Sequence, residues 1–182
     1  MLLVQEFLLT NSLQNLIDKH GVYSSLSNDK TKISLNYSQI ESNCYDALAN
    51  QCRGLILRKL DGSTFDDNKS KTVGQTIVID YPFDRFLNYE QNKNFNFNEK
   101  CKFYKKLDGS LIILYYDVII NKWFVATRSV SEANVIFNGH YTFKQLFELA
   151  LREQYNLNYD DFTKIAQEIC HPFRMAYELC YY

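Results

Sequence analysis

KFYKKLDGSLIILYY, residues 102–116, places two strand-forming runs on either side of an Asp-Gly pair. Aromatic and β-branched residues favour extended backbone, and Asp-Gly suits a tight turn because glycine tolerates positive φ. The stretch therefore predicts a β-hairpin that turns at Asp108-Gly109, with Lys106 and Asp108 on one face. Burial against an apolar sheet disfavours the ammonium form of lysine and lowers its pKa. Lys106 is therefore a candidate nucleophile.

The pentapeptide Lys-Leu-Asp-Gly-Ser occurs twice, at residues 59–63 and again at 106–110. The first copy leads into the polar run 64–69, whereas the second leads into a long apolar strand. Only the second copy is expected to lie in a core, so we favour Lys106 and interpret Lys59 as a solvated hairpin position. An ordinary hairpin turn at both copies is the alternative.

Composition limits the class of protein. A chain of 182 residues with 46% hydrophobic content predicts one globular domain, and no linker, repeat or low-complexity tract divides it. The 20 basic and 21 acidic residues nearly cancel, so no global field draws the chain to nucleic acid or to a membrane. No apolar run is long enough to span a membrane, and we expect a cytoplasmic protein, in the host cytoplasm if it is viral.

The cysteines argue against two further classes. They are odd in number and show no Cys-x-x-Cys spacing with histidine partners, which argues against a zinc site and a disulfide framework. The five are Cys44, Cys52, Cys101, Cys170 and Cys180.

Hydrophobic periodicity predicts an α+β fold, mainly antiparallel sheet with flanking helices. Helical spacing occurs over residues 2–20, with a break near 10–12 and Gly21 as the cap, and over 45–50, 142–154 and 159–169. Strand patterns occupy residues 31–37, 53–60, 77–80, 110–116, 122–128 and 173–182. In strand 53–60, alternation predicts that Arg53 shares a face with Leu55 and Leu57.

Four charged residues lie in segments whose other residues predict burial in the core: Arg53, Arg85, Arg128 and Glu178. Buried charge is costly unless it is paired or used, so these residues either pair with one another, reach solvent at strand ends, or form a site. With Lys106 they supply cations for phosphates, an acid for a ribose and apolar walls for a base. This combination predicts a nucleotide site. Most of the 27 tyrosines and phenylalanines have core spacing, although some could stack bases.

Five segments in chain order carry these residues: Gln51-Cys52-Arg53-Gly54, residues 82–88, residues 106–111, Thr127-Arg128-Ser129 and Tyr177-Glu178-Leu179. Together they resemble the phage-type RNA ligase 1 family, over most of the chain. The resemblance implies a ligase-type nucleotidyltransferase domain in which Lys106 attacks the α-phosphate of ATP. It also implies that Arg53 and Arg85 hold the β and γ phosphates, that Arg128 and Glu178 address the ribose side, and that Gly109 allows close backbone approach.

The resemblance further implies ATP and Mg²⁺ as cofactors and RNA ends as substrates. AMP would pass from the lysine to an RNA 5′-phosphate, and an RNA 3′-hydroxyl would then displace it. The residues that would bind the metal are not identified. A capping guanylyltransferase or DNA ligase with the same lysine chemistry is one alternative, and a non-catalytic nucleotide- or RNA-binding remnant is another.

The chain departs from the family pattern at two places. Where the family has an aromatic residue against the nucleotide, this chain has Leu35, with Tyr37 two positions later, and either could line the pocket. The family also continues into a metal-associated acid and a Lys-x-Lys segment, neither of which follows Glu178. We therefore expect residues 1–182 to be the N-terminal portion of the domain, without the C-terminal part of the catalytic domain.

Overall fold

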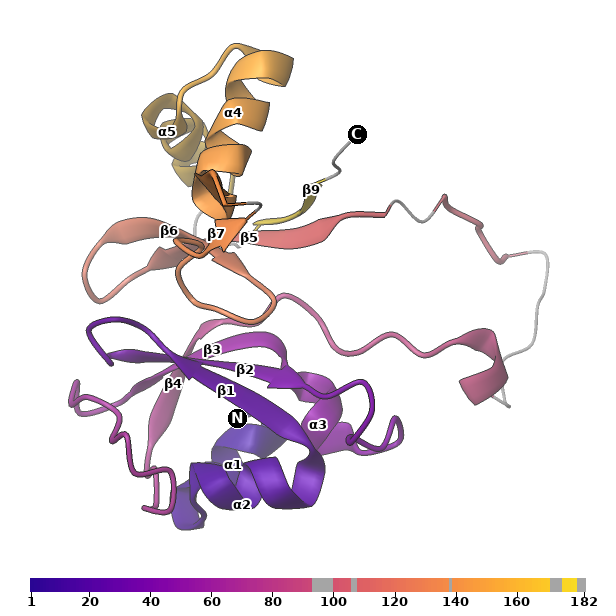
Figure 1. The fold of residues 1–182 in the computed structure, drawn as a ribbon, viewed down its shortest axis with the longest axis vertical. Helices are drawn as coiled ribbons and strands as arrows, with labels where there is room; N and C mark the ends of the chain where they lie inside the picture. The colour runs from indigo at the N-terminus through magenta and orange to yellow at the C-terminus, as the bar shows by residue number, and fades with distance from the viewer. Residues whose placement is uncertain (93–99, 106–107, 138, 171–174, 180–182) are drawn as a thin grey trace.

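Two antiparallel sheets stack face to face between two layers of helices (Figure 1). The computed structural model describes residues 1–92, 100–105, 108–137, 139–170 and 175–179, and for Cys170 and residues 175–179 it describes the backbone alone. Strands of the first sheet follow the order β1-β2-β3-β4, and those of the second follow β6-β5-β9. Helices α1, α2 and α3 cover the outer face of the first sheet, and α4 and α5 cover that of the second. The predicted mixture of helices and antiparallel sheet is confirmed.

The elements of the first half are α1 (Leu3–Thr10), α2 (Leu13–His20), β1 (Val22–Leu26), β2 (Lys32–Tyr37), α3 (Ala47–Gln51), β3 (Arg53–Lys59) and β4 (Thr76–Asp80). A 3-10 turn, η1 (Tyr89–Gln91), lies in the connection to the second half. The second half contains β5 (Ser110–Asp117), β6 (Lys122–Thr127), β7 (Ile136–Phe137), β8 (Tyr141–Thr142), α4 (Phe143–Tyr155), α5 (Tyr159–Cys170) and β9 (Met175–Leu179).

Capping residues set the helix boundaries much as the sequence predicts. The Ser12 side chain accepts a hydrogen bond from the backbone N–H of Asn15 and begins α2, and Gly21 ends it with a φ of 61°. The Thr142 side chain caps α4 in the same way. The predicted break between the first two helices is therefore confirmed. Among the described residues, no helix is long and apolar enough to cross a membrane.

Strand alternation divides the core into three layers. In β5, Ile112 and Leu114 pack under α4 and α5, whereas Ile113 and Tyr115 face the first sheet. The layer between the sheets also contains residues of the first sheet, among them Ile56 and Ile79. This shared apolar layer fixes the two sheets relative to each other.

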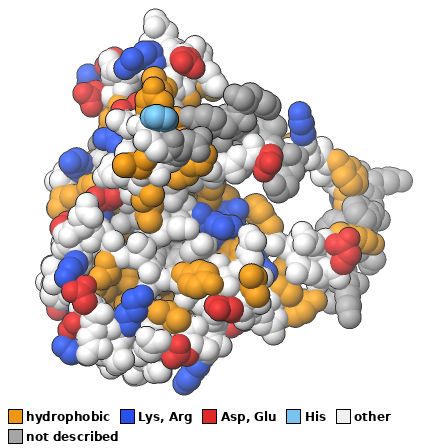
Figure 2. Space-filling model, viewed as in Figure 1, with side chains coloured by type: hydrophobic (Ala, Val, Ile, Leu, Met, Phe, Trp, Pro, Cys, Tyr) orange, Lys and Arg blue, Asp and Glu red, His pale blue; other side chains and the backbone are white. Residues whose placement is uncertain are grey.

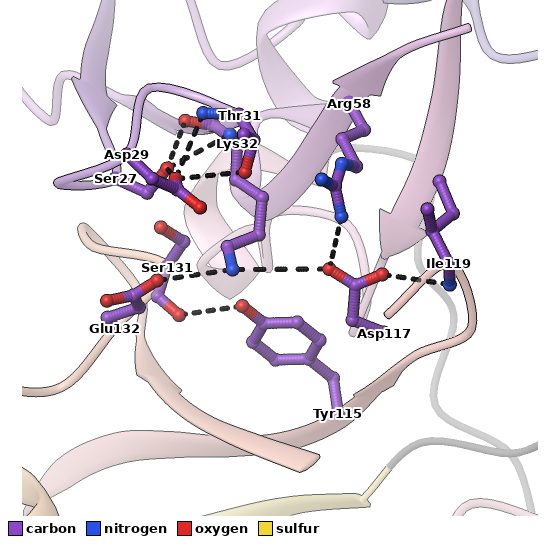
Figure 3. Close-up of polar contacts among 10 residues, drawn as sticks. All are labelled: Ser27, Asp29, Thr31, Lys32, Arg58, Tyr115, Asp117, Ile119, Ser131 and Glu132. Carbon is purple, nitrogen blue, oxygen red and sulfur yellow. Dashed lines mark hydrogen bonds and ion pairs between the residues drawn. The ribbon is translucent and has the colours of Figure 1, made fainter. Parts of the chain in front are cut away.

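Buried ionic groups join the same two sheets near one end (Figure 3). Lys32 Nζ lies 3.1 Å from Glu132 Oε1 and 4.0 Å from Asp117 Oδ2, and it stacks 3.7 Å above the centre of the Phe124 ring. Arg58 Nη1 donates to Asp117 Oδ2 at 2.8 Å. Lys32 is 1% exposed and Asp117 is fully buried, so these charges are compensated inside the protein rather than by water.

The predicted hairpin at residues 102–116 is wrong in its first strand. Residues 101–105 have no regular secondary structure, and Lys106 and Leu107 lie outside the described residues. The physical reason is that β5 is paired on both edges, with β6 on one side and with the distant β9 on the other. A neighbouring strand from 102–105 has no free edge to join.

Candidate nucleotide-binding site

A β-bulge at Gly54 sets the direction of Arg53. In the ladder between β2 and β3, Leu35 lies opposite Leu55, but the next residue of β2, Asn36, lies opposite Arg53. Gly54, with a φ of 80°, is therefore the extra residue in β3. Residues directly opposite each other share a face, so Arg53 lies on the face of Asn36. That face is the inner one, because the Asn36 amide donates to Ser129 Oγ, beyond the end of β6, at 3.3 Å. The prediction that Arg53 shares a face with Leu55 is therefore wrong.

Arg53 stacks on two phenylalanines of the segment that follows β4. Its Cζ lies 4.3 Å from the centre of the Phe83 ring and 4.8 Å from that of Phe86. The two rings are 5.0 Å apart and nearly parallel, with an interplanar angle of 13°. A guanidinium held on aromatic faces retains its charge and loses less rotamer freedom on binding an anion.

Arg85 is held by three contacts. Its Cζ lies 4.4 Å above the centre of the Tyr37 ring, its Nη1 donates to Ser42 Oγ at 2.9 Å, and its backbone N–H donates to the Asn50 carbonyl at 2.9 Å. The Ser42 hydroxyl in turn donates to the Ser38 carbonyl. Arg85 is therefore oriented from both its backbone and its guanidinium.

The loop that carries Ser42 is fixed by close packing. A Cβ on Gly21 would lie 2.6 Å from the backbone nitrogen of Ser42, so only glycine permits this approach. At the other end of the loop, Asp46 caps α3 and lies 2.7 Å from His20 Nδ1. Burial acts to raise the pKa of Asp46, but the His20 contact and the hydrogen bonds from the helix outweigh it and lower the pKa below 3.8.

Arg128 completes a group of three arginines. It follows β6, its Cζ lies 5.8 Å from the centre of the Tyr37 ring, and its Cα lies 3.5 Å from the position of a Cβ on Gly54. Leu35 is fully buried in the core beneath the helices. Tyr37, and not Leu35, is therefore the residue that lies with the arginines.

Gly109 and Glu178 lie at the end of the second sheet where Arg128 also lies. Gly109 directly precedes β5, Glu178 is opposite Leu111 in the ladder, and β6 ends at Thr127, opposite Ile112. The side chain of Glu178 and the whole of Lys106 are outside the described structure. The backbone positions of the other predicted site residues thus converge on one end of the stacked sheets.

The first copy of the repeated pentapeptide lies at the opposite end. Lys59 is the last residue of β3 and lies six positions after Arg53, about 20 Å away at the usual rise per residue. Asp61 accepts hydrogen bonds from the backbone and hydroxyl of Ser63 and forms a local turn. This copy is a surface turn after a strand.

Figure 2 shows the molecule hollowed between its two halves, with Lys or Arg side chains at the inner edge of the hollow. Positive charge at a recessed surface is suited to phosphate groups. Within the described ranges, no group of three or more His, Cys, Asp or Glu side chains lies close enough to hold a metal ion.

Sequence reasoning missed two contributions to this arrangement. The bulge had a local signal, because a glycine inside an otherwise apolar strand often marks one. Ser42 had no such signal, since its role depends on a contact with Arg85, 43 positions away in the chain.

Two known proteins are similar in sequence to this chain. A bifunctional polynucleotide kinase/RNA ligase of Autographa californica nuclear polyhedrosis virus is 31% identical over 164 residues, covering 84% of this chain and 21% of that protein. An RNA ligase of Rhodothermus phage RM378 is 27% identical over 135 residues, covering 57% of this chain and 27% of that protein.

The chain therefore spans about a fifth of the length of the viral kinase/ligase and about a quarter of the length of the phage RNA ligase. No protein-family profile matches the chain, and no solved structure matches it. The names of the two relatives support a phage-type RNA ligase family for this chain.

Proposed function

We propose that this chain is the nucleotidyltransferase portion of an ATP-dependent RNA ligase, with Lys106 as the nucleophile. The observation that carries the proposal is that Arg85 and Arg128 meet at the Tyr37 ring, while Arg53 lies opposite the neighbouring Asn36 in the ladder. Gly109, three residues after Lys106, leads into β5 at this same end of the sheets. The names of the two relatives support ligation of RNA as the overall reaction.

The proposed reaction has three steps. The neutral amine of Lys106 attacks the α-phosphorus of ATP, a P–N bond forms, the bond to pyrophosphate breaks, and the amine loses a proton. An RNA 5′-phosphate then takes the AMP from the lysine. An RNA 3′-hydroxyl finally attacks the activated 5′ end and releases AMP.

Each arginine has a distinct part in this proposal. Arg53 and Arg85 hold the β and γ phosphates and neutralise charge that builds up on the departing pyrophosphate. Arg128, together with Glu178, addresses the ribose, and Gly109 lets the backbone approach the nucleotide. Fixed cations serve this purpose well, because they need little reorganisation during the reaction.

The proposal includes Mg²⁺ bound together with ATP. Mg²⁺ prefers substrate phosphates, water and one or two carboxylates to an all-protein set of ligands. When bound, the ion would supply further neutralisation of the triphosphate.

The test is covalent labelling with ATP labelled at the α-phosphate in the presence of Mg²⁺. We expect an acid-labile and base-stable label on the 182-residue chain, because a phosphoramidate is hydrolysed in acid and is stable in base.

Two variants decide the nucleophile. Lys106→Ala should abolish the label, and Lys59→Ala should leave it nearly unchanged. Label that survives Lys106→Ala but disappears in Lys59→Ala would reverse the assignment. Tight ATP binding with no label even after long incubation would assign the chain to nucleotide binding without catalysis.

A further inference from the structure

In the proposed reaction, the position that pyrophosphate leaves is later occupied by the RNA 5′-phosphate. In the first step Lys106 attacks, and pyrophosphate leaves on the opposite side of the α-phosphorus. In the second step the lysine is the leaving group, so the RNA 5′-phosphate must enter opposite it, where pyrophosphate has left. Arg53 and Arg85 therefore face pyrophosphate first and the RNA 5′-phosphate afterwards.

An exposed aromatic ring lies directly beside these arginines. Phe86 is 67% exposed, although it is adjacent in sequence to Arg85 and its ring lies next to that of the half-buried Phe83. Arg53 lies over both rings and supports the pair. Such exposure of a large apolar ring next to cations is typical of a surface that binds single-stranded nucleic acid.

We propose that Phe86, supported by Phe83, is the stacking surface for the 5′-terminal base of the RNA that receives AMP. This inference rests on the proposed function. The phosphate of the terminal nucleotide lies at Arg53 and Arg85, and its base reaches the neighbouring ring. Stacking of this kind is tolerant of sequence, because every base has a π face.

In the second step of the proposed reaction, AMP passes from Lys106 to the RNA 5′-phosphate at this position. An oxygen of the RNA 5′-phosphate forms a bond to the AMP phosphorus, the P–N bond to Lys106 breaks, and the released amine takes up a proton.

The one acid within the Phe83–Phe86 segment, Asp84, accepts a hydrogen bond from the Tyr81 hydroxyl. The two arginines thus outweigh a single, hydrogen-bonded carboxylate at this surface.

Phe86 is poorly placed for the adenine of ATP. If Arg53 and Arg85 hold the β and γ phosphates, the adenosine lies beyond the α-phosphate, on the side of Arg128 and Glu178. The ring beside the β and γ phosphates is then left for a different nucleotide. The two assignments predict different losses when Phe86 is changed.

The experiment compares RNA binding with ATP binding in the 182-residue chain. Fluorescence anisotropy measures the affinity for a short single-stranded RNA labelled at its 3′ end, with either a 5′-phosphate or a 5′-hydroxyl, and calorimetry measures the affinity for ATP. The variants are Phe86→Ala and Phe86→Trp. Tyr155→Ala is the matched control, because Tyr155 is 66% exposed at the end of α4, away from the arginines.

We expect the wild-type chain to prefer the 5′-phosphorylated RNA. Phe86→Ala should weaken that binding about tenfold, within the range measured for loss of base stacking. The ATP affinity should fall clearly less, because Phe83 still supports Arg53. Phe86→Trp and Tyr155→Ala should bind RNA like the wild type. Unchanged thermal midpoints would show that the variants are folded.

The outcomes separate the inference from the function on which it rests. Wild-type RNA affinity in Phe86→Ala, or no preference for the 5′-phosphate while ATP binds normally, overturns the stacking surface alone. An equal loss of ATP and RNA binding in Phe86→Ala reassigns the ring to adenine. A wild-type chain that binds neither ATP nor RNA overturns the proposed function itself.

Discussion

Arg58 of β3 donates a 2.8 Å hydrogen bond to the carboxylate of Asp117 at the end of β5, so a buried ion pair connects the two sheets. The same carboxylate lies 4.0 Å from Lys32 Nζ and accepts the backbone N–H of Ile119 at 3.1 Å. These contacts lie at the end of the sheets opposite the arginine group. The sheets are thus held by charge at one end while the other end presents charge for a ligand.

Asp117→Asn should be strongly destabilising. It leaves Arg58 and Lys32 buried without this counter-charge, and breaking a buried pair in this way typically costs about 3–5 kcal/mol. Glu132→Gln should cost less, since the Glu132 side chain is 21% exposed and can exchange its partner for water. Urea unfolding measures both variants. A cost for Glu132→Gln equal to that of Asp117→Asn would show that the inter-sheet pair is not the dominant contact.

Gly54→Ala should disturb both stability and the arginine group. The new Cβ would lie 3.0 Å from Ile113 Cδ1 and 3.5 Å from the Arg128 Cα, in a residue whose φ is 80°. Gly74→Ala is the matched control, because Gly74 has a φ of 85° and an added methyl group there would meet nothing within 4 Å. The strain of a positive φ, about 1–2 kcal/mol, is common to both. We expect a larger loss in thermal unfolding for Gly54→Ala, together with weaker ATP binding that Gly74→Ala does not show.

Arg53→Ala and Arg85→Ala should each weaken binding of ATP more than binding of AMP. The reason is that both arginines are assigned to the β and γ phosphates, which AMP lacks. Calorimetric titration with the two nucleotides measures the difference, and loss of one charge-assisted contact predicts a difference of about 1.5–3 kcal/mol. Equal losses for the two nucleotides would remove these residues from the phosphate site.

Ser42→Ala should act through Arg85. Without the hydroxyl, the guanidinium loses its 2.9 Å contact and is free to rotate above Tyr37, so the ATP affinity should fall by a few-fold while the AMP affinity is unchanged. Ser42→Thr retains the hydroxyl and should restore the preference for ATP. A parallel fall in both affinities would indicate a general loosening of the loop, and no change in either would contradict the positioning role.

Asp29 predicts an acid-sensitive contribution to stability. Burial acts to raise its pKa, but hydrogen bonds from Ser27 and Thr31 outweigh this effect and lower the pKa from 3.8 to about 2. Because the folded-state pKa is the lower one, the contribution is present above pH 3.8 and is lost as the pH falls towards about 2. Asp29 is largely solvated, so the size is smaller than the shift alone implies.

Asp29→Asn should remove this dependence. The free energy of unfolding of the wild type should fall relative to that of the variant between pH values of about 5 and 2.5, as measured by urea denaturation at each pH. A difference between the two proteins that does not vary with pH would contradict the assignment.

Local chemistry made much of this fold predictable. Ser12 and Gly21 mark the limits of α2, and the alternation around Ile33 shows which face of β2 packs in the core beneath the helices. The arginines were recognisable as a group because each is a charge within an apolar segment, and buried charge needs a partner or a use. The sequence could not show that Arg85 and Arg128 meet at Tyr37, because that depends on contacts among distant segments.

The errors also have physical causes. The single residue inserted by the bulge at Gly54 moves Arg53 to the other face of the sheet. A prediction from strict alternation takes no account of such an insertion. β1 was missed because Val22–Leu26 is short and has two serines at its centre, and its pairing with β2 outweighs this weak local preference. The first strand of the predicted hairpin is absent because β9, which pairs Leu179 with the distant Ser110, takes the edge of β5.

This pairing has a consequence for the order of events during synthesis. Neighbours in the first sheet are consecutive in the chain, so that sheet can assemble once residue 80 has left the ribosome. β5 must wait for Leu179, the partner of Ser110, before both its edges are paired. Long-range pairing of this kind forms late, because the intervening chain must first be ordered. The sheet that carries Arg53 therefore forms before the strand that carries Glu178, and the site of a nascent chain stays incomplete until residue 179 has left the ribosome.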